Sequence, residues 1–145
     1  MLDAMGGARV SAHVLFVDPG ARVLLRLRDE RPDLPYPGQW DLVGGAVEFQ
    51  ETIHEAALRE VKEEIGLDVV GLEYFGEYPE NGVDNNAFVA PLAVPLEQLV
   101  LTEGQRLLYA SEAELSTLDV VPWVARLLRD FFACSGVARR AIAGR

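Results

Sequence analysis

Three glutamates, Glu60, Glu63 and Glu64, stand three and four residues apart in one short stretch of the chain. In a helix this spacing places the carboxylates on one face, within an arc of about 100°. Opposite charges usually meet at such spacings on a solvated helix, as Arg59 and Glu63 do, but Glu60 meets like charges. Carboxylates held this close repel one another unless a cation lies among them, and Mg²⁺ binds a few carboxylates together with waters and substrate phosphates. The stretch therefore predicts a helix-borne site for Mg²⁺, or for Mn²⁺, that takes a phosphorylated ligand.

The helix that must carry these glutamates has clear signals at both ends. Thr52 can cap its start, with Glu55 three residues later to complete a capping box. Neither Pro nor Gly interrupts the segment until Gly66, a typical helix stop. A second arc beside the carboxylates is apolar and predicts the face that packs on the core: Ala57, Leu58, Val61 and Ile65.

Residues 45–67 fit a longer pattern, Gly-x5-Glu-x7-Arg-Glu-aliphatic-x-Glu-Glu-x-Gly-aliphatic, at every fixed position. The matching residues are Gly45, Glu51, Arg59, Glu60, Val61, Glu63, Glu64, Gly66 and Leu67. This pattern is the Nudix box, and over it the chain resembles the Nudix hydrolase family. Two nearby positions depart from the family's usual residues, because Val43 stands where proline is usual and Gln50 where glycine is usual. Neither removes a ligand, so they bear on loop rigidity and substrate preference rather than on the chemistry.

The resemblance implies a reaction and the residues that perform it. Nudix hydrolases cleave a nucleoside diphosphate linked to another moiety, which gives a nucleoside monophosphate and the phosphorylated remainder. By resemblance, Glu60, Glu63 and Glu64 ligate Mg²⁺, assisted by the backbone carbonyl of Gly44. One glutamate is also expected to take the proton from water; Glu60 is our candidate, since like-charged neighbours raise the pKa of a carboxylate. Related enzymes often place a glutamate on a loop ahead of the last strand, and Glu103 fits that place.

Several charged residues have two interpretations. Arg59 and Glu51 are expected to form an ion pair that pins the glycine loop to the helix, which favours structural support over direct catalysis for Arg59. Glu103 either completes the metal shell, acts as the base, or is an exposed loop acid. For Glu48 an exposed loop carboxylate is the better interpretation.

Substrate-binding candidates precede the helix: Arg26, Arg28, Trp40 and Gly45. The two arginines alternate along a strand and so share a face. They either keep an edge strand soluble or bring a guanidinium to a substrate phosphate.

Other aromatic and polar residues are expected to be mainly structural. The aromatic residues fit a core or strand face better than base stacking, the asparagines fit a turn better than a base edge, and the histidines lack metal-ligand spacing. These residues are Tyr36, Trp40, Tyr78 and Phe88, then Asn85 and Asn86, and finally His13 and His54.

Composition excludes several classes of function. The formal net charge of −10 argues against binding duplex nucleic acid through a broad basic surface. Small phosphorylated substrates stay compatible, because bound cations reverse the local field. No segment approaches the length of a membrane span, and the first seven residues lack the basic and apolar regions of a signal peptide. Cys134 is the only cysteine, so no internal disulfide can form and we expect a reducing cytoplasm.

Length and pattern predict a single domain, residues 1–145, with residues 137–145 as a mobile tail. Strands are expected at residues 9–17, 22–28, 40–45, 69–78, 87–94 and 107–110, with a polar turn over 79–86. A helical turn is expected after Ser111, and a second main helix near Pro122. Strands with two main helices indicate an α/β sandwich, and the resemblance makes it a Nudix-type α/β/α sandwich with a mixed central sheet.

These observations favour a pyrophosphohydrolase that cleaves a (deoxy)nucleoside triphosphate, or its oxidised form, to monophosphate and pyrophosphate. No extra motif marks a subfamily, so the triphosphate is a default, and a sugar nucleotide or ADP-ribose is the main alternative. A sensor that binds a nucleotide without cleaving it is disfavoured, because a pure binder does not need three mutually repelling carboxylates. The isomerase relatives that use a catalytic cysteine are disfavoured because Cys134 lies in the terminal helix. The expected partner is a small nucleotide, and a homodimer stays open.

Overall fold

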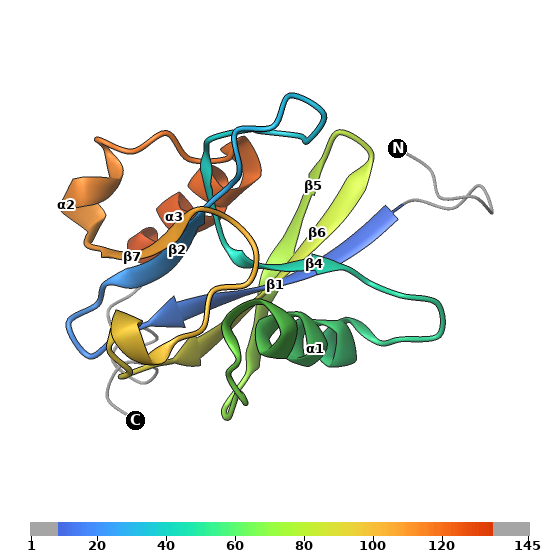
Figure 1. Cartoon of the computed structure of the whole chain (residues 1–145), viewed down its shortest axis with the longest axis horizontal. Coiled ribbons are helices and arrows are strands. Elements are labelled where there is room, and N and C mark those ends of the chain that lie inside the picture. The colour runs from blue at the N-terminus through green and yellow to red at the C-terminus, as the bar shows by residue number, and fades with distance from the viewer. Residues whose placement is uncertain (1–8, 135–145) are drawn as a thin grey trace.

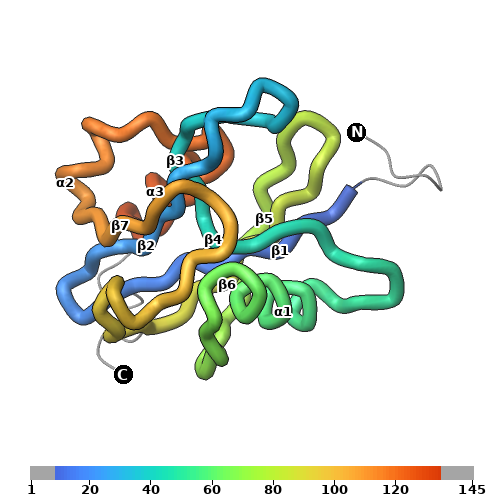
Figure 2. Tube along the Cα trace, viewed as in Figure 1, coloured from blue at the N-terminus to red at the C-terminus, as the bar shows by residue number. Residues whose placement is uncertain are grey.

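The computed structural model describes residues 9–134. The described strands form one sheet in which β3, β2, β1, β6 and β5 lie side by side in that order, while β4 pairs with β1 and β7 with β2 (Figures 1 and 2). Among these strands β1 and β6 run parallel, and the other pairs are antiparallel. The strands are β1 (Arg9–Val17), β2 (Val23–Leu27), β3 (Trp40–Asp41), β4 (Val43–Ala46), β5 (Glu73–Glu80), β6 (Val83–Pro91) and β7 (Arg106–Ala110).

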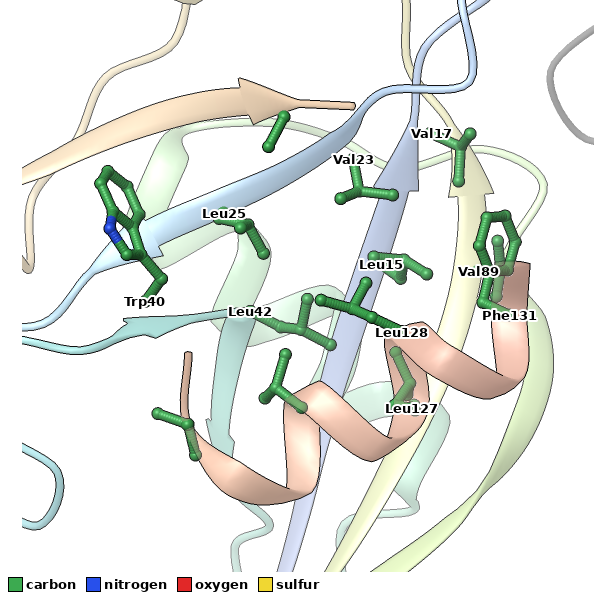
Figure 3. Close-up of a cluster of buried hydrophobic side chains, with 14 of the residues drawn as sticks. Leu15, Val17, Val23, Leu25, Trp40, Leu42, Val89, Leu127, Leu128 and Phe131 are labelled. Atoms are coloured by element: carbon green, nitrogen blue, oxygen red, sulfur yellow. The ribbon is translucent and has the colours of Figure 1, made fainter. Parts of the chain in front are cut away.

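A helix covers each face of this sheet (Figure 1). Successive side chains of β1 point to opposite faces, so Val14 and Phe16 join the core beneath α1 (Ile53–Ile65), while Leu15 joins the core beneath α3 (Pro122–Ala133). Figure 3 shows the second core, in which α3 directs its apolar side chains, among them Leu127 and Phe131, at the sheet. The predicted α/β/α sandwich with a mixed sheet is confirmed.

The predicted ends of α1 are also confirmed. The Glu55 backbone N–H donates to the Thr52 hydroxyl at 3.0 Å, and the Thr52 N–H donates to the Glu55 carboxylate at 2.9 Å, so the capping box is complete. Gly66 then adopts the left-handed conformation, with φ of 68°, and its N–H donates to the Lys62 carbonyl. The helix that carries the glutamates is therefore fixed at both ends by local interactions.

Shorter elements complete the chain. The predicted helical turn after Ser111 is α2 (Glu112–Leu115), which has its own capping box, and Pro122 opens α3 as expected. A 3₁₀ turn, η1 (Leu96–Gln98), precedes the segment that leads into β7. The expected tail, residues 137–145, lies outside the described residues. Within residues 9–134 no helix is long and apolar enough to span a bilayer.

The β5–β6 hairpin differs from the prediction. The polar turn expected over residues 79–86 is wrong, because β5 continues to Glu80 and β6 begins at Val83. All of β6 pairs in parallel with β1, so a strand far away in the sequence, rather than local propensity, draws the polar residues of this segment into the sheet. β5 likewise begins at Glu73 rather than at Val69.

The central strands also correct one expectation. β2 pairs with β7 on one side and with β1 and β3 on the other. It is therefore an interior strand, and the interpretation of Arg26 and Arg28 as residues that keep an edge strand soluble is wrong. The strand expected at residues 40–45 is divided into β3 and β4, which pair with different neighbours.

Candidate active site

Three glutamates of α1, Glu60, Glu63 and Glu64, lie in different surroundings. Glu64 is buried, with 1% of its surface exposed; it accepts a hydrogen bond from the Gly44 N–H at 3.0 Å and another from the guanidinium of Arg26. Glu60 is largely buried, whereas Glu63 lies mostly in solvent. Burial raises the pKa of Glu64 well above its ordinary value, against the opposing attraction of Arg26. Exposure to solvent thus increases from Glu64 through Glu60 to Glu63.

Arg59 is the cation among the other carboxylates. Its Nε and Nη2 bind both oxygens of Glu51, at 2.7 and 3.0 Å, and Nη2 also donates to the Ala46 carbonyl at 3.0 Å. Its Nη1 lies 3.0 Å from Glu60 Oε1 and 3.3 Å from Glu63 Oε2. Hydrogen bonding to Arg59 lowers the pKa of Glu51 to about 2. The predicted ion pair between Arg59 and Glu51 is present, and it ties the glycine loop to α1.

The carboxylates in this structure are partnered by arginines. Within residues 9–134, no three His, Cys, Asp or Glu side chains converge as a metal-binding group in this arrangement. Glu60 and Glu63 share Arg59, and Glu64 binds a second arginine. The donor set nevertheless fits a hard divalent cation, since it consists of carboxylate oxygens gathered at one end of a helix beside the backbone of Gly44. Rotation of flexible side chains away from Arg59 would free those oxygens.

The glycine loop, Gly44 and Gly45, lies in β4, where these two residues allow the chain to approach α1 and β1. A Cβ on Gly45 would lie 2.7 Å from the carboxylate of Glu60, and a Cβ on Gly44 would lie 2.4 Å from the backbone oxygen of Ala12. Gln50 adopts a φ of 64°, a left-handed conformation that glycine adopts without strain. Glutamine in place of the family's usual glycine at this position therefore strains the loop between β4 and α1 and leaves the proposed metal ligands unchanged.

The segment between η1 and β7 brings Glu103 to the same end of α1. The Thr102 N–H donates to the Glu64 carbonyl at 2.9 Å, and its hydroxyl donates to the Glu63 carbonyl at 2.6 Å, which satisfies carbonyls that the helix end leaves open. The next residue, Glu103, has its Oε2 3.7 Å from Nη1 of Arg26, the arginine that also holds Glu64. The structure thus places Glu103 beside the glutamates, while its 67% exposed side chain leaves the interpretation as a loop acid open.

The two candidate arginines lie in different surroundings. Arg26 is 5% exposed and its guanidinium holds Glu64, so it supports that carboxylate from within the protein. Arg28 donates to Asp41 Oδ2 at 3.0 Å and to the Pro35 carbonyl at 2.9 Å, and it lines the neighbouring cavity. Of the two, Arg28 is the one placed to meet a ligand there.

A cavity of about 510 Å³ opens next to the glycine loop, among β1, the β5–β6 hairpin and the loop that precedes β3. Asn85 lies in its wall with both ends of its amide fixed: the Ser11 hydroxyl donates to Oδ1 at 2.7 Å, and Nδ2 donates to the Tyr78 carbonyl at 3.0 Å. Trp123 supplies an apolar wall, and Gly45 borders the cavity on the side of α1. An aromatic surface beside an oriented amide suits a planar ligand with hydrogen-bonding edges.

His13 also lines this cavity and has a structural place in it. Its Nε2 lies 3.1 Å from Ser11 Oγ, and its ring packs against Trp123 with centroids 4.8 Å apart. Burial lowers the pKa of His13 to about 4, so the ring is neutral at neutral pH. The other histidine, His54, is exposed and packs edge-on against Phe88.

Of the remaining aromatic candidates, one lies in the core and another lines the cavity. Trp40 is 6% exposed, packs in the core beneath α3 and has Arg106 over its ring, so the structure places this predicted substrate contact away from the cavity wall. Tyr36 lines the cavity, although its pattern suggested a structural aromatic. The sequence did not identify two further residues of the cavity wall, Trp123 and Asp41. The apolar periodicity of its helix marks Trp123 only as a core residue, and Asp41 is a single acidic residue in a short strand.

Comparison with known proteins identifies the class to which this fold and site belong. A family model described as the NUDIX domain matches residues 7–126. Since that range covers most of the chain, the chain belongs to the Nudix family of hydrolases, as its box indicates.

Particular relatives are similar over different extents. The chain is 46% identical over 52 residues to nucleoside triphosphatase NudI of Escherichia coli O139:H28, a match that spans 36% of each protein. Among solved structures, it is similar to the MutT protein from Methanosarcina mazei Go1, at 27% identity and a TM-score of 0.65 over 86% of this chain and 89% of that one. A nudix hydrolase family member from Chromobacterium violaceum gives a TM-score of 0.72 over 99% of this chain and 92% of the other, but at 20% identity it supports the fold alone.

Proposed function

We propose that this chain is a divalent-metal-dependent pyrophosphohydrolase that converts a (deoxy)nucleoside triphosphate, or its oxidised form, to a nucleoside monophosphate and pyrophosphate. The observation that carries the proposal is the position of Gly45. This residue borders the cavity and approaches the Glu60 carboxylate too closely to admit a Cβ. A ligand whose base lies in the cavity would therefore extend its phosphates past the glycine loop to the glutamates.

The residues divide the chemistry among them. Glu60, Glu63, Glu64 and the Gly44 carbonyl would hold Mg²⁺ or Mn²⁺, with Glu103 able to join them. When bound, such an ion lowers the pKa of water and neutralises charge that develops on the leaving phosphate.

The protein itself supplies positioning and electrostatics, which provide most of the rate in phosphoryl transfer. Glu60 is the candidate acceptor of the proton from the attacking water, because its carboxylate lies against Gly45, which borders the cavity. Arg28 faces the cavity and offers a planar cation to phosphate oxygens. Arg59 acts as a positioning residue, since its contacts are with the glutamates and the Ala46 carbonyl.

The alternatives receive less support. Similarity to nucleoside triphosphatase NudI favours a nucleoside triphosphate over a sugar nucleotide or ADP-ribose, although the match covers only 36% of that protein. A sensor that binds without cleaving would have no use for the glutamate cluster, which this chain retains whole. We further propose a cytoplasmic location, as the single cysteine suggests.

A substrate panel tests the function. Wild-type protein, Glu63→Gln and the exposed control Glu97→Gln would be given nucleoside triphosphates, their oxidised forms, sugar nucleotides and ADP-ribose, with Mg²⁺ or with a chelator. We expect metal-dependent release of pyrophosphate from triphosphates by the wild type and the control, and nearly complete loss in Glu63→Gln with the fold intact. Near-normal turnover by Glu63→Gln would refute the assignment of the glutamates as metal ligands. Cleavage of sugar nucleotides or ADP-ribose alone would refute the nucleoside triphosphate as substrate.

A further inference from the structure

Two segments that are far apart in the sequence meet at the cavity: the loop between β2 and β3, and the turn between β5 and β6. The Tyr36 hydroxyl donates to Glu80 Oε2 at 2.6 Å and accepts a hydrogen bond from Asn81 Nδ2 at 2.8 Å. Figures 1 and 2 show the loop reaching the tip of the hairpin. Tyr36, Glu80 and Asn81 all line the cavity, so this bridge is part of its wall.

The hairpin end of the bridge is anchored to α3. Arg126 Nη1 donates to Glu80 Oε1 at 3.2 Å, and its Nη2 donates to the Pro79 carbonyl at 3.0 Å. With one oxygen held by Arg126, the other oxygen of Glu80 is directed to Tyr36. Burial and the neighbouring carboxylate raise the pKa of Tyr36 above its ordinary value, so the hydroxyl keeps the proton that it donates.

The loop end of the bridge depends on tertiary contacts. Tyr36 has a φ of 53°, a left-handed conformation that is unfavourable for an aromatic residue and persists where surrounding contacts impose it. Arg28 holds the preceding residue through the Pro35 carbonyl, which ties the loop to the inner side of the cavity. The bridge to Glu80 ties the same loop to the outer side.

We infer that Tyr36 is a positioning residue for the base of the substrate, because its bridge to Glu80 and Asn81 fixes the width of the cavity that Trp123 also lines. The inference rests on the proposed function, since it takes the cavity as the place of the base. Once the bridge is broken, the loop can move away from the hairpin and the base loses one wall. The glutamates at the phosphate end have Arg26 and Arg59 as partners rather than the residues of the bridge.

The substitution Tyr36→Phe keeps the ring and removes both hydrogen bonds. Tyr109→Phe is the control, because it likewise removes a tyrosine hydroxyl that is hydrogen-bonded, to the Val94 carbonyl at 2.9 Å, in a part of the chain that does not line this cavity. Each protein would be assayed with a nucleoside triphosphate and with 2-deoxyribose 5-triphosphate, which has no base. KM and kcat would be measured for both substrates, after circular dichroism has shown that each variant is folded.

For Tyr36→Phe we expect the ratio of KM for the nucleoside triphosphate to KM for the base-free substrate to rise at least fivefold over wild type, with the change in KM rather than kcat. Tyr109→Phe should keep the wild-type ratio, and Glu80→Gln, which retains the shape of the acceptor and loses its charge, should shift it in the same direction as Tyr36→Phe. An unchanged ratio in a folded Tyr36→Phe, or in Glu80→Gln if the first variant does not fold, would overturn the inference. Failure of the wild type to cleave either triphosphate would instead overturn the proposed function, and the role of the bridge with it.

Discussion

Replacement of the adjacent glycines Gly44 and Gly45 by alanine should have different effects: the first on stability, the second on turnover. At Gly44, a Cβ would lie 2.4 Å from the Ala12 oxygen and 2.5 Å from the His13 Cα, both backbone atoms of β1 that cannot rotate away, and φ is 153°. Overpacking typically costs about 1–3 kcal/mol and a strained backbone about 1–3 kcal/mol more. Gly44→Ala should therefore lose about 2–6 kcal/mol of unfolding free energy, a large part of the stability of an ordinary domain.

Gly45→Ala should behave differently, because the atoms that its Cβ would meet at 2.7 Å belong to the carboxylate of Glu60. That side chain can turn aside, so the loss of unfolding free energy should stay within about 1 kcal/mol. The displaced carboxylate, however, would leave its place between Arg59 and the loop. Turnover should fall at least tenfold, which corresponds to about 1.4 kcal/mol of barrier.

Urea denaturation of both variants, together with steady-state kinetics and calorimetric titration with Mn²⁺, separates the two effects. Gly45→Ala should unfold near the wild-type midpoint yet bind Mn²⁺ more weakly, whereas Gly44→Ala should unfold at a much lower urea concentration. Similar losses of stability in the two variants would refute this account of the close approach. So would a Gly45→Ala protein with wild-type kinetics.

Two further predictions concern single side chains. Glu103→Gln should reduce turnover at least about tenfold, or about 1.4 kcal/mol of barrier, with little effect on stability because the side chain is largely exposed; an unchanged kcat would make Glu103 an ordinary loop acid. The pKa of His13 falls from 6.5 to about 4 on folding, so as the pH drops the unfolded chain binds a proton at His13 before the folded chain does. The free energy of unfolding therefore keeps its full value above pH 6.5 and decreases as the pH drops toward 4. Between pH 7 and pH 4.5 this loss should amount to about 2.5 kcal/mol, and urea denaturation of His13→Gln should show that much less dependence on pH; equal pH dependence in the two proteins would contradict the burial argument.

Features set by neighbouring residues could be predicted from the sequence. The capping box at Thr52 and Glu55 and the stop at Gly66 depend on residues three or four positions away, and the structure has both. The ion pair between Glu51 and Arg59 also follows from helical spacing once the helix is placed. Local chemistry therefore specifies the part of the fold that carries the glutamates.

Features set by distant residues could not be predicted. Asn85 and Asn86 suggested a turn, yet they lie in β6, because Ser11 of the parallel strand β1 supplies hydrogen-bonding partners to both side chains. Arg26 looked like a surface arginine until its partner, Glu64, was found 38 residues away. The cavity likewise depends on Trp123 and Tyr36, which only the folded chain brings together with Asn85.

The position of Arg59 has a consequence for how the protein endures a shortage of metal. Arg59 contacts Glu51, Glu60 and Glu63, and Arg26 contacts Glu64, so arginines of the chain itself offset part of the repulsion among these carboxylates. If those carboxylates bind a metal ion as proposed, loss of the ion would stop turnover while the carboxylates keep their arginine partners. The folded protein would then regain activity when the ion is restored.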